Sequence, residues 1–337
     1  MQRPRPYASF DSRAAAAAAL PTPTPPTPRP RVGRGAQIHA RAACRRRLSA
    51  SFDSRAAAVL AVTAALAVAV TSTPAVAKPT PVVVAVVYLG GPDAGAEGKA
   101  LIDDLVDHLE ETTGVEAGTF VGAYFNETAP AARHLQKNKD AFILGSLGFY
   151  LANRAALGLK PLATLSGNSG TDERHSVVVK KGRFASLEAL RHKRLYGSPL
   201  YEAPAYVNRV IFAGRLDAAT HFDLKPTSRP LSALRKLEKD EADAVLVNEV
   251  QLESLRRLPL FEKLQVVFTS APQPALSLMV ASTPRTDPLV AKVQSAVLAL
   301  CATPAGEALC KNFGILGFAA LEPGALDAVT KLYETGL

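Results

Sequence analysis

The stretch Val82-Val83-Val84-Ala85-Val86-Val87-Tyr88 is an unbroken apolar run that ends at Leu89-Gly90-Gly91-Pro92. A run of this kind is typical of a strand that is buried on both faces, as in a sheet covered by helices. Apolar residues then recur at helical spacing from Leu101 to Leu109 and stop at Gly114, whose missing Cβ suits a left-handed helix end. This segment therefore predicts a strand, a turn and a helix in that order.

The same alternation continues along the chain and predicts an α/β fold. Further strands are expected at Ala141–Leu144, Leu162–Leu165, His175–Val179, Arg194–Tyr196, Ala244–Val247, Leu264–Phe268 and Leu276–Ala281. We expect two lobes, each a mostly parallel sheet flanked by helices, joined by two crossing segments. Residues 78–182 with 271–337 form the first lobe and 183–270 the second, with hinges near Lys181 and Pro272.

An export signal is predicted at residues 45–77. Arg45 to Arg47 give it a positive start, Ala56 to Val70 form an uncharged apolar run, and Ala75-Val76-Ala77 is a signal-peptidase site. The alternative, a membrane anchor, needs roughly 20 apolar residues, which is more than this run provides. Residues 1–44 are rich in Pro, Ala and Arg and are expected to be disordered. The mature protein would then begin at Lys78 in the periplasm.

The net charge of +9 belongs to this leader. Of the 39 Lys and Arg and 30 Asp and Glu residues, residues 1–77 hold 11 and two, which leaves 28 of each sign. A nucleic-acid partner therefore loses its main electrostatic support. Cys301 and Cys310 stand nine apart, and either a disulfide or two buried thiols fits that spacing.

Five segments in order carry a family resemblance: Asp140–Tyr150, Lys160–Leu165, Leu187–Leu190, Leu234–Val245 and Ser270–Pro274. Together they resemble the phosphate, phosphite and phosphonate group of periplasmic solute-binding proteins. The resemblance implies a type II periplasmic binding protein fold, whose two lobes close on a small ligand and present it to an inner-membrane ABC permease. It implies a phosphonate-like or phosphate-like oxyanion as ligand, no cofactor, and we expect a monomer.

One segment departs from that group. Its members typically open the first helix of the second lobe with a Ser/Thr-rich run that holds the oxyanion, whereas this chain has Gly197-Ser198-Pro199-Leu200-Tyr201-Glu202. Ser198 is the one Ser or Thr residue in this segment. Because Glu202 would repel an anion, three hypotheses stay open: the ligand has a cationic end, Glu202 points away, or the ligand is not a phosphonate.

Ligands of open α/β sheets bind beyond the carboxyl ends of the strands. The candidate contacts at those ends are Tyr88, Gly90, Gly145, Ser146, Tyr150, Asn168, Ser169, Ser198, Tyr201, Glu202 and Asn248. Ser146 could instead only cap a helix, the tyrosines could be core residues, and Asn168, Ser169 and Asn248 could be turn residues.

Catalytic and metal-binding patterns are poor. Gly98-Lys99 lacks the rest of a phosphate loop, and no His is spaced as a metal ligand. We expect a binding protein that is not an enzyme. The alternative functions are a periplasmic sensor of the same fold and, less favoured, an exported enzyme.

The export hypothesis predicts the N-terminus of the processed chain. Intact-mass and N-terminal analysis of protein recovered from the periplasm should give a chain that starts at Lys78, because the small residues Ala75 and Ala77 stand third and first before the cut. A chain that retains residues 45–77 would contradict cleavage.

Overall fold

The computed structural model describes residues 80–336 apart from 92, 94, 168 and 169. The predicted extension at 1–44, the export signal at 45–77 and the candidate contacts Asn168 and Ser169 therefore lie outside the described residues. Residues 74–337 belong to one compact unit.

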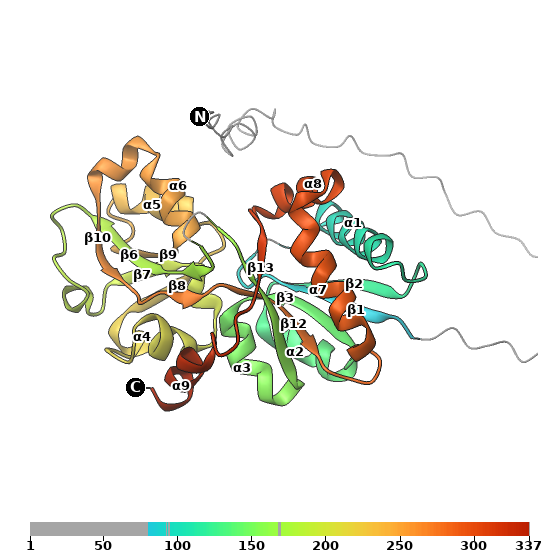
Figure 1. Cartoon of the computed structure of the whole chain (residues 1–337). Coiled ribbons are helices and arrows are strands. Elements are labelled where there is room, and N and C mark those ends of the chain that lie inside the picture. The colour runs from blue at the N-terminus through green and yellow to red at the C-terminus, as the bar shows by residue number, and fades with distance from the viewer. Residues whose placement is uncertain (1–79, 92, 94, 168–169, 337) are drawn as a thin grey trace, which may run out of the picture. The chain divides into compact units, whose positions relative to one another are not determined.

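The first of two main sheets has six strands. Their spatial order is β13 (Phe318–Ala320), β4 (Leu159–Leu165), β12 (Leu276–Ala281), β3 (Ala141–Gly145), β1 (Val82–Val87) and β2 (Phe120–Phe125). The helices around it are α1 (Ala96–Thr113), α2 (Thr128–Lys137), α3 (Leu147–Leu157), α7 (Val290–Ala299) and α8 (Pro304–Phe313). In Figure 1, α1, α7 and α8 lie above this sheet and α2 and α3 below it.

The apolar run of β1 is buried on both faces, as its sequence predicts. Val82, Val84 and Val86 pack in a core with α1, α7 and α8. The alternate residues of the strand, such as Val83 and Val87, enter a second core that includes α2 and α3. Since side chains alternate along a strand, a covered strand must be apolar at every position.

The second sheet has five strands in the order β10 (Leu264–Thr269), β6 (His175–Lys180), β9 (Ala244–Asn248), β7 (Arg194–Gly197) and β8 (Asp223–Pro226). Helices α5 (Pro230–Glu238) and α6 (Glu249–Arg256) pack on one face. The π-helix η4 (Tyr206–Ile211) and α4 (Ala218–His221) pack on the other, in the same core that contains Val83 and Val87. One apolar core therefore runs through both sheets.

The α/β fold with two sheets is confirmed, but the sheets are mixed rather than mostly parallel. β1 runs parallel to β2 and β3, whereas β12 runs antiparallel to β3 and β4. In the second sheet β7 is parallel to β8 and β9, whereas β6 is antiparallel to β9 and β10. Four of the five antiparallel pairs in these two sheets involve β6 or β12, the strands that the chain enters directly after passing from one sheet to the other, and the fifth joins β13 to β4.

Two short strands mark these passages. β5 (Asp172–Glu173) lies between β4 and β6, β11 (Gln273–Pro274) lies between β10 and β12, and the two pair antiparallel. The expected hinge at Pro272 is thus next to a crossing, but the one at Lys181 is not. The strand His175–Lys180, which we expected in the first lobe, belongs to the second sheet because the chain crosses before it.

The C-terminal helix α9 (Asp327–Thr335) also departs from the expected division. Arg209 of η4 donates from Nη1 to the carbonyl oxygens of Tyr333 and Glu334, at 2.7 and 2.9 Å. Arg154 of α3 forms an ion pair with Glu334. Helix α9 therefore contacts elements of both halves, although residues 271–337 were expected to belong to the first lobe.

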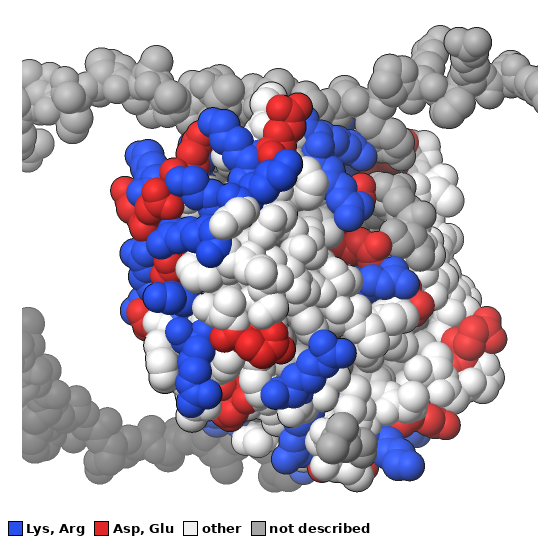
Figure 2. Space-filling view, turned by 90° about the vertical axis from the view of Figure 1, so that its left-hand side faces the viewer, with Lys and Arg blue, Asp and Glu red and all other residues white. Residues whose placement is uncertain are grey.

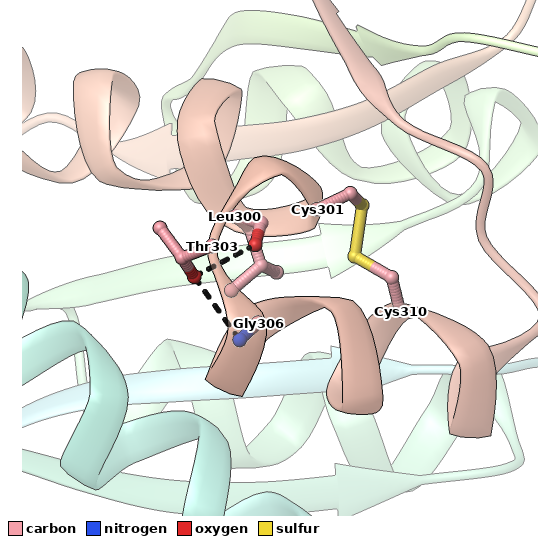
Figure 3. The surroundings of a disulfide bond; sticks show 5 residues. All are labelled: Leu300, Cys301, Thr303, Gly306 and Cys310. Carbon is pink, nitrogen blue, oxygen red and sulfur yellow. Dashed lines mark hydrogen bonds between the residues drawn. A yellow bond between two sulfur atoms is a disulfide. The ribbon is translucent and has the colours of Figure 1, made fainter.

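Cys301 and Cys310 form a disulfide between the turn after α7 and helix α8, with Cα atoms 5.6 Å apart (Figure 3). Thr303 caps α8: its hydroxyl accepts from Gly306 N at 3.1 Å and donates to Leu300 O at 3.3 Å. A Cβ at Gly306 would collide with the Leu300 carbonyl. The turn is thus held by a covalent link, a cap and a close backbone approach.

Within the described residues, no single helix is long and apolar enough to cross a membrane; Asp287–Ala302 and Pro304–Asn312 meet that criterion only as a pair bent by 84°.

Candidate functional site

The two halves meet at the turns that follow their strands. Gly90, two residues after Tyr88 in the turn beyond β1, has φ +68°, and a Cβ there would collide with the ring of Tyr201. Tyr201 lies in the short helix η3 (Pro199–Tyr201), just after β7. We call this contact region the junction; it comprises Gly90, Ser146, Gly148, Glu173, His175, Tyr201, Glu202 and Tyr206.

A buried carboxylate lies at the junction. Ser146 caps α3, because its Oγ accepts from Phe149 N at 3.0 Å, and the hydroxyl also hydrogen-bonds Glu202 from the other half. A Cβ at Gly148 would collide with Oε2 of Glu202 and lie 3.0 Å from the Tyr206 ring. Within the described residues, Oε2 of Glu202 is buried without a hydrogen-bond partner. Glu202 therefore points into the junction rather than away from it.

A second carboxylate comes from the first crossing segment. Glu173 of β5 accepts a hydrogen bond from Asn248 and lies 4.0 Å from Nε2 of His175. The Glu173 side chain keeps 32% of its surface exposed, whereas His175 is 5% exposed. The ring of His175 meets that of Tyr206 edge-on, with 6.3 Å between centroids. Glu173 and Glu202 thus both act on Tyr206, and the charge of Glu173 also acts on Glu202.

Burial shifts the pKa values of these groups. Desolvation raises the pKa of Glu202 to about 7, although the hydrogen bond from Ser146 opposes the rise and the charge of Glu173 adds to it. Desolvation also raises the pKa of Glu173 to about 7 and lowers that of His175 to about 4. The pKa of Tyr206 lies well above its ordinary value for the same reason. Charged forms are disfavoured here unless a partner of opposite charge arrives.

Ser198 and Asn248 are held in place by one glutamine. Asn248 caps α6, since its Oδ1 accepts from Gln251 N at 2.9 Å, and the Gln251 side chain accepts from Asn248 N at 3.2 Å in a capping box. Gln251 Nε2 also donates to Ser198 Oγ at 3.1 Å. Asn248 is therefore the N-cap of α6, and its amide also reaches Glu173.

The structure brings together most of the candidate contacts that it describes. Gly90 meets Tyr201, Ser146 meets Glu202, and Ser198 joins Asn248 through Gln251. Tyr88, 59% exposed, lies beside the Gly90 turn, and Gly145 ends β3 next to Val87. Tyr150 is instead buried in the apolar core at 8% exposure, which fits the core alternative.

Sequence reasoning missed Gly148, Glu173, His175 and Tyr206. Glu173 lies outside the strands that the sequence predicts, and His175 is expected in a first-lobe strand as a core or solvated histidine, whereas the structure places it in the second sheet. Gly148 could have been found from its position two residues after the Ser146 cap, because a glycine at the start of a helix lets another side chain approach the helix backbone closely. Among the described residues, no group of three or more His, Cys, Asp or Glu side chains could hold a metal ion.

The fold and the junction define a two-lobed α/β binding protein whose candidate site is built from strand-end turns. Residues 94–325 match the family of phosphonate ABC transporter periplasmic substrate-binding proteins, and the chain belongs to this family. The family consists of periplasmic substrate-binding components of transporters, which work with an ABC permease. No curated protein matches the sequence significantly.

Solved structures of the same fold are similar over most of their length. The binding protein of a Pseudomonas aeruginosa ABC phosphonate transporter has 14% identity and a TM-score of 0.59, over 77% of this chain and 87% of that one. A Xanthomonas citri protein solved with chloride has 17% identity and a TM-score of 0.59, over 77% and 98%. PhnD1 of Prochlorococcus marinus, solved with methylphosphonate, has 13% identity and a TM-score of 0.56, over 76% and 98%. These likenesses establish the fold.

The contact between Gly90 and Tyr201 predicts a specific sensitivity to a methyl group. Gly90→Ala should lower the melting temperature more than Gly158→Ala, because both residues have positive φ but only Gly90 faces a neighbour. Backbone strain alone costs about 1 kcal/mol, and overpacking adds about 1 to 3 kcal/mol. When Tyr201→Ala is added to Gly90→Ala, the extra loss of melting temperature relative to Gly158→Ala should disappear. Equal losses of melting temperature in Gly90→Ala and Gly158→Ala would contradict the contact between Gly90 and Tyr201.

The raised pKa of Glu202 predicts a pH-dependent effect of Glu202→Gln. A carboxyl whose folded pKa exceeds its unfolded value stabilises the fold at low pH and loses that contribution as pH rises through about 7. The melting temperature of the variant relative to wild type should therefore rise between pH 6 and pH 8, by about 2 to 4 °C. Asp104→Asn, on the exposed face of α1, is the control; a flat difference for Glu202→Gln would contradict the burial.

Proposed function

We propose that the protein captures a small phosphonate that carries an ammonium group and delivers it to an ABC permease. Membership of the phosphonate-binding family supports the oxyanion. The two carboxylates of the junction support the cationic end. The observation that carries this proposal is the buried Oε2 of Glu202, which no described group neutralises or hydrogen-bonds.

The charge of the junction argues against a simple phosphonate dianion. Two like charges repel more strongly as water is excluded between them, so an anion placed beside ionised Glu202 and Glu173 is penalised. An ammonium group on the ligand reverses that interaction and returns both carboxyls to their charged forms. Of the three hypotheses for Glu202, the cationic ligand fits its inward orientation.

The oxyanion end would contact groups on both halves. Helix α3 starts at Ser146 with unpaired backbone N–H groups in its first turn, which favour negative charge. Ser198 accepts from Gln251, so its own hydroxyl hydrogen remains available to a ligand. We assign the start of α3 and Ser198 to the oxyanion and Glu202 and Glu173 to the ammonium group, with Ser146 orienting Glu202 and Tyr201 covering the ligand.

Binding requires the junction to open and close. We assign the six-stranded sheet to the first lobe and the five-stranded sheet to the second, with rotation about the paired crossing segments β5 and β11. The close approach of Tyr201 to Gly90 corresponds to the closed arrangement, in which a permease could recognise the loaded protein. The protein would be exported, cleaved after Ala77, monomeric and without catalytic activity.

A ligand series tests the proposal. 2-Aminoethylphosphonate should bind at least tenfold more tightly than ethylphosphonate, because a charge-assisted hydrogen bond is worth about 1.5 to 3 kcal/mol. Glu202→Gln should remove most of that preference, and Asp104→Asn should leave it intact. Isothermal titration calorimetry measures the dissociation constants of both compounds for the wild type and for each variant.

Two results would separate the parts of the proposal. Equal binding of both compounds to wild type and Glu202→Gln would reject the ammonium assignment while leaving a phosphonate-binding protein. Failure of every phosphonate to bind, with the fold intact, would reject the phosphonate itself.

A further inference from the structure

The charge of the chain after residue 77 is unevenly distributed. Residues 175–269, which contain the five-stranded sheet, hold 16 Lys and Arg against 11 Asp and Glu, whereas residues 78–174 and 270–337 hold 12 against 17. The balanced total therefore hides a basic half and an acidic half. An asymmetry of this size creates a field that orients the molecule toward a charged surface.

Strand register places the basic residues at the end of this half that faces away from the junction. On the junction side His175 pairs with Asn248 and Gly197 with Leu246. At the opposite ends of the same strands Lys180 pairs with Leu264 and Arg194 with Asp223. We call this second side, with the loops and helix ends next to it, the outer edge.

Part of the positive charge at the outer edge is neutralised locally. Asp240 pairs with Lys180 and Arg183, Asp243 pairs with Arg183 and Arg194, and Glu238 pairs with Lys263. This network holds the end of α5 against the starts of β7 and β9. The remaining cations of the edge form no ion pair within the described residues.

Those remaining cations outnumber the acids around them. Six exposed side chains form no ion pair within the described residues: Lys181, Arg191, Lys193, Arg235, Lys239 and Arg257. Glu188, Glu241 and Glu262 are exposed acids of the same loops and helix ends that likewise form no ion pair within the described residues. Figure 2, which faces this end of the molecule, shows Lys and Arg side chains gathered along one side with fewer Asp and Glu between them.

We propose that the outer edge binds the anionic headgroup surface of a lipid bilayer. The six cations come from separate loops and helix ends, on long side chains without a shared buried pocket. That arrangement fits many laterally mobile phosphates better than one phosphate or peptide held in fixed geometry. Attraction of this kind adds up over several Lys and Arg residues and decays within a Debye length of about 8 Å.

The proposal is independent of the ligand. Because the outer edge lies across the sheet from the junction, a bilayer on one side leaves the junction free to exchange its ligand on the other. The protein would be concentrated at a membrane surface, where diffusion to a membrane partner is two-dimensional.

Vesicle sedimentation tests the proposal with the form recovered from the periplasm, since residues 1–77 carry their own positive charge. The protein should sediment with phosphatidylcholine vesicles that contain phosphatidylglycerol, and not with phosphatidylcholine alone. Binding should fall severalfold when salt is raised. Arg235→Glu with Lys239→Glu should lower the bound fraction at least severalfold, while Lys292→Glu with Lys311→Glu, the same charge change on α7 and α8, should lower it far less.

A second outer-edge double variant, Lys181→Glu with Arg257→Glu, provides the same test if the first double variant does not fold. Melting curves show whether each double variant is folded. Absence of binding to anionic vesicles would overturn the proposal. Equal losses in the outer-edge and control pairs would also overturn it, since net charge rather than this surface would then set the affinity. Binding only to an acidic protein partner, with no vesicle binding, would assign the surface to that partner instead.

Discussion

The buried carboxylate of Glu202 is the constraint on which the junction depends. It requires a glycine opposite, because any side chain at residue 148 would occupy the place of Oε2. It also requires the Ser146 hydroxyl, which ties the start of α3 to the other half. Burying a carboxyl that is only partly hydrogen-bonded costs stability, and this cost is why we propose a role for Glu202 in binding.

The surrounding fold holds this group between the two halves of the protein. One apolar core continues from the six-stranded sheet into the π-helix that carries Tyr206. The paired strands β5 and β11 cross between the sheets, and helix α9 is held by Arg209 on one side and Arg154 on the other. In the proposed closure, the strand-end turns of the two halves come together. Opening must then separate Tyr201 from Gly90.

Much of this fold follows from local sequence signals. The both-face burial of β1, the left-handed glycine after α1 and the cap at Ser146 are short-range features, and each lies where its residues predict. Strand direction and sheet membership depend on long-range pairing, which a single sequence does not reveal. For this reason the sequence predicts β6 in the first lobe, although it belongs to the second sheet, and does not reveal that α9 contacts both halves. Glu173 and His175 reach Glu202 only through the crossing of the chain, which a local pattern does not reveal, whereas Tyr206 lies four residues after Glu202 in the same segment.

The most direct test of the account is the pKa of Glu202, measured by carbon-detected NMR titration of its carboxyl with and without ligand. The account predicts a value of about 7 in the free protein and a clear fall when an amine-bearing phosphonate binds. A value near the ordinary 4.5 in the free protein, or one that ligand binding leaves unchanged, would contradict it.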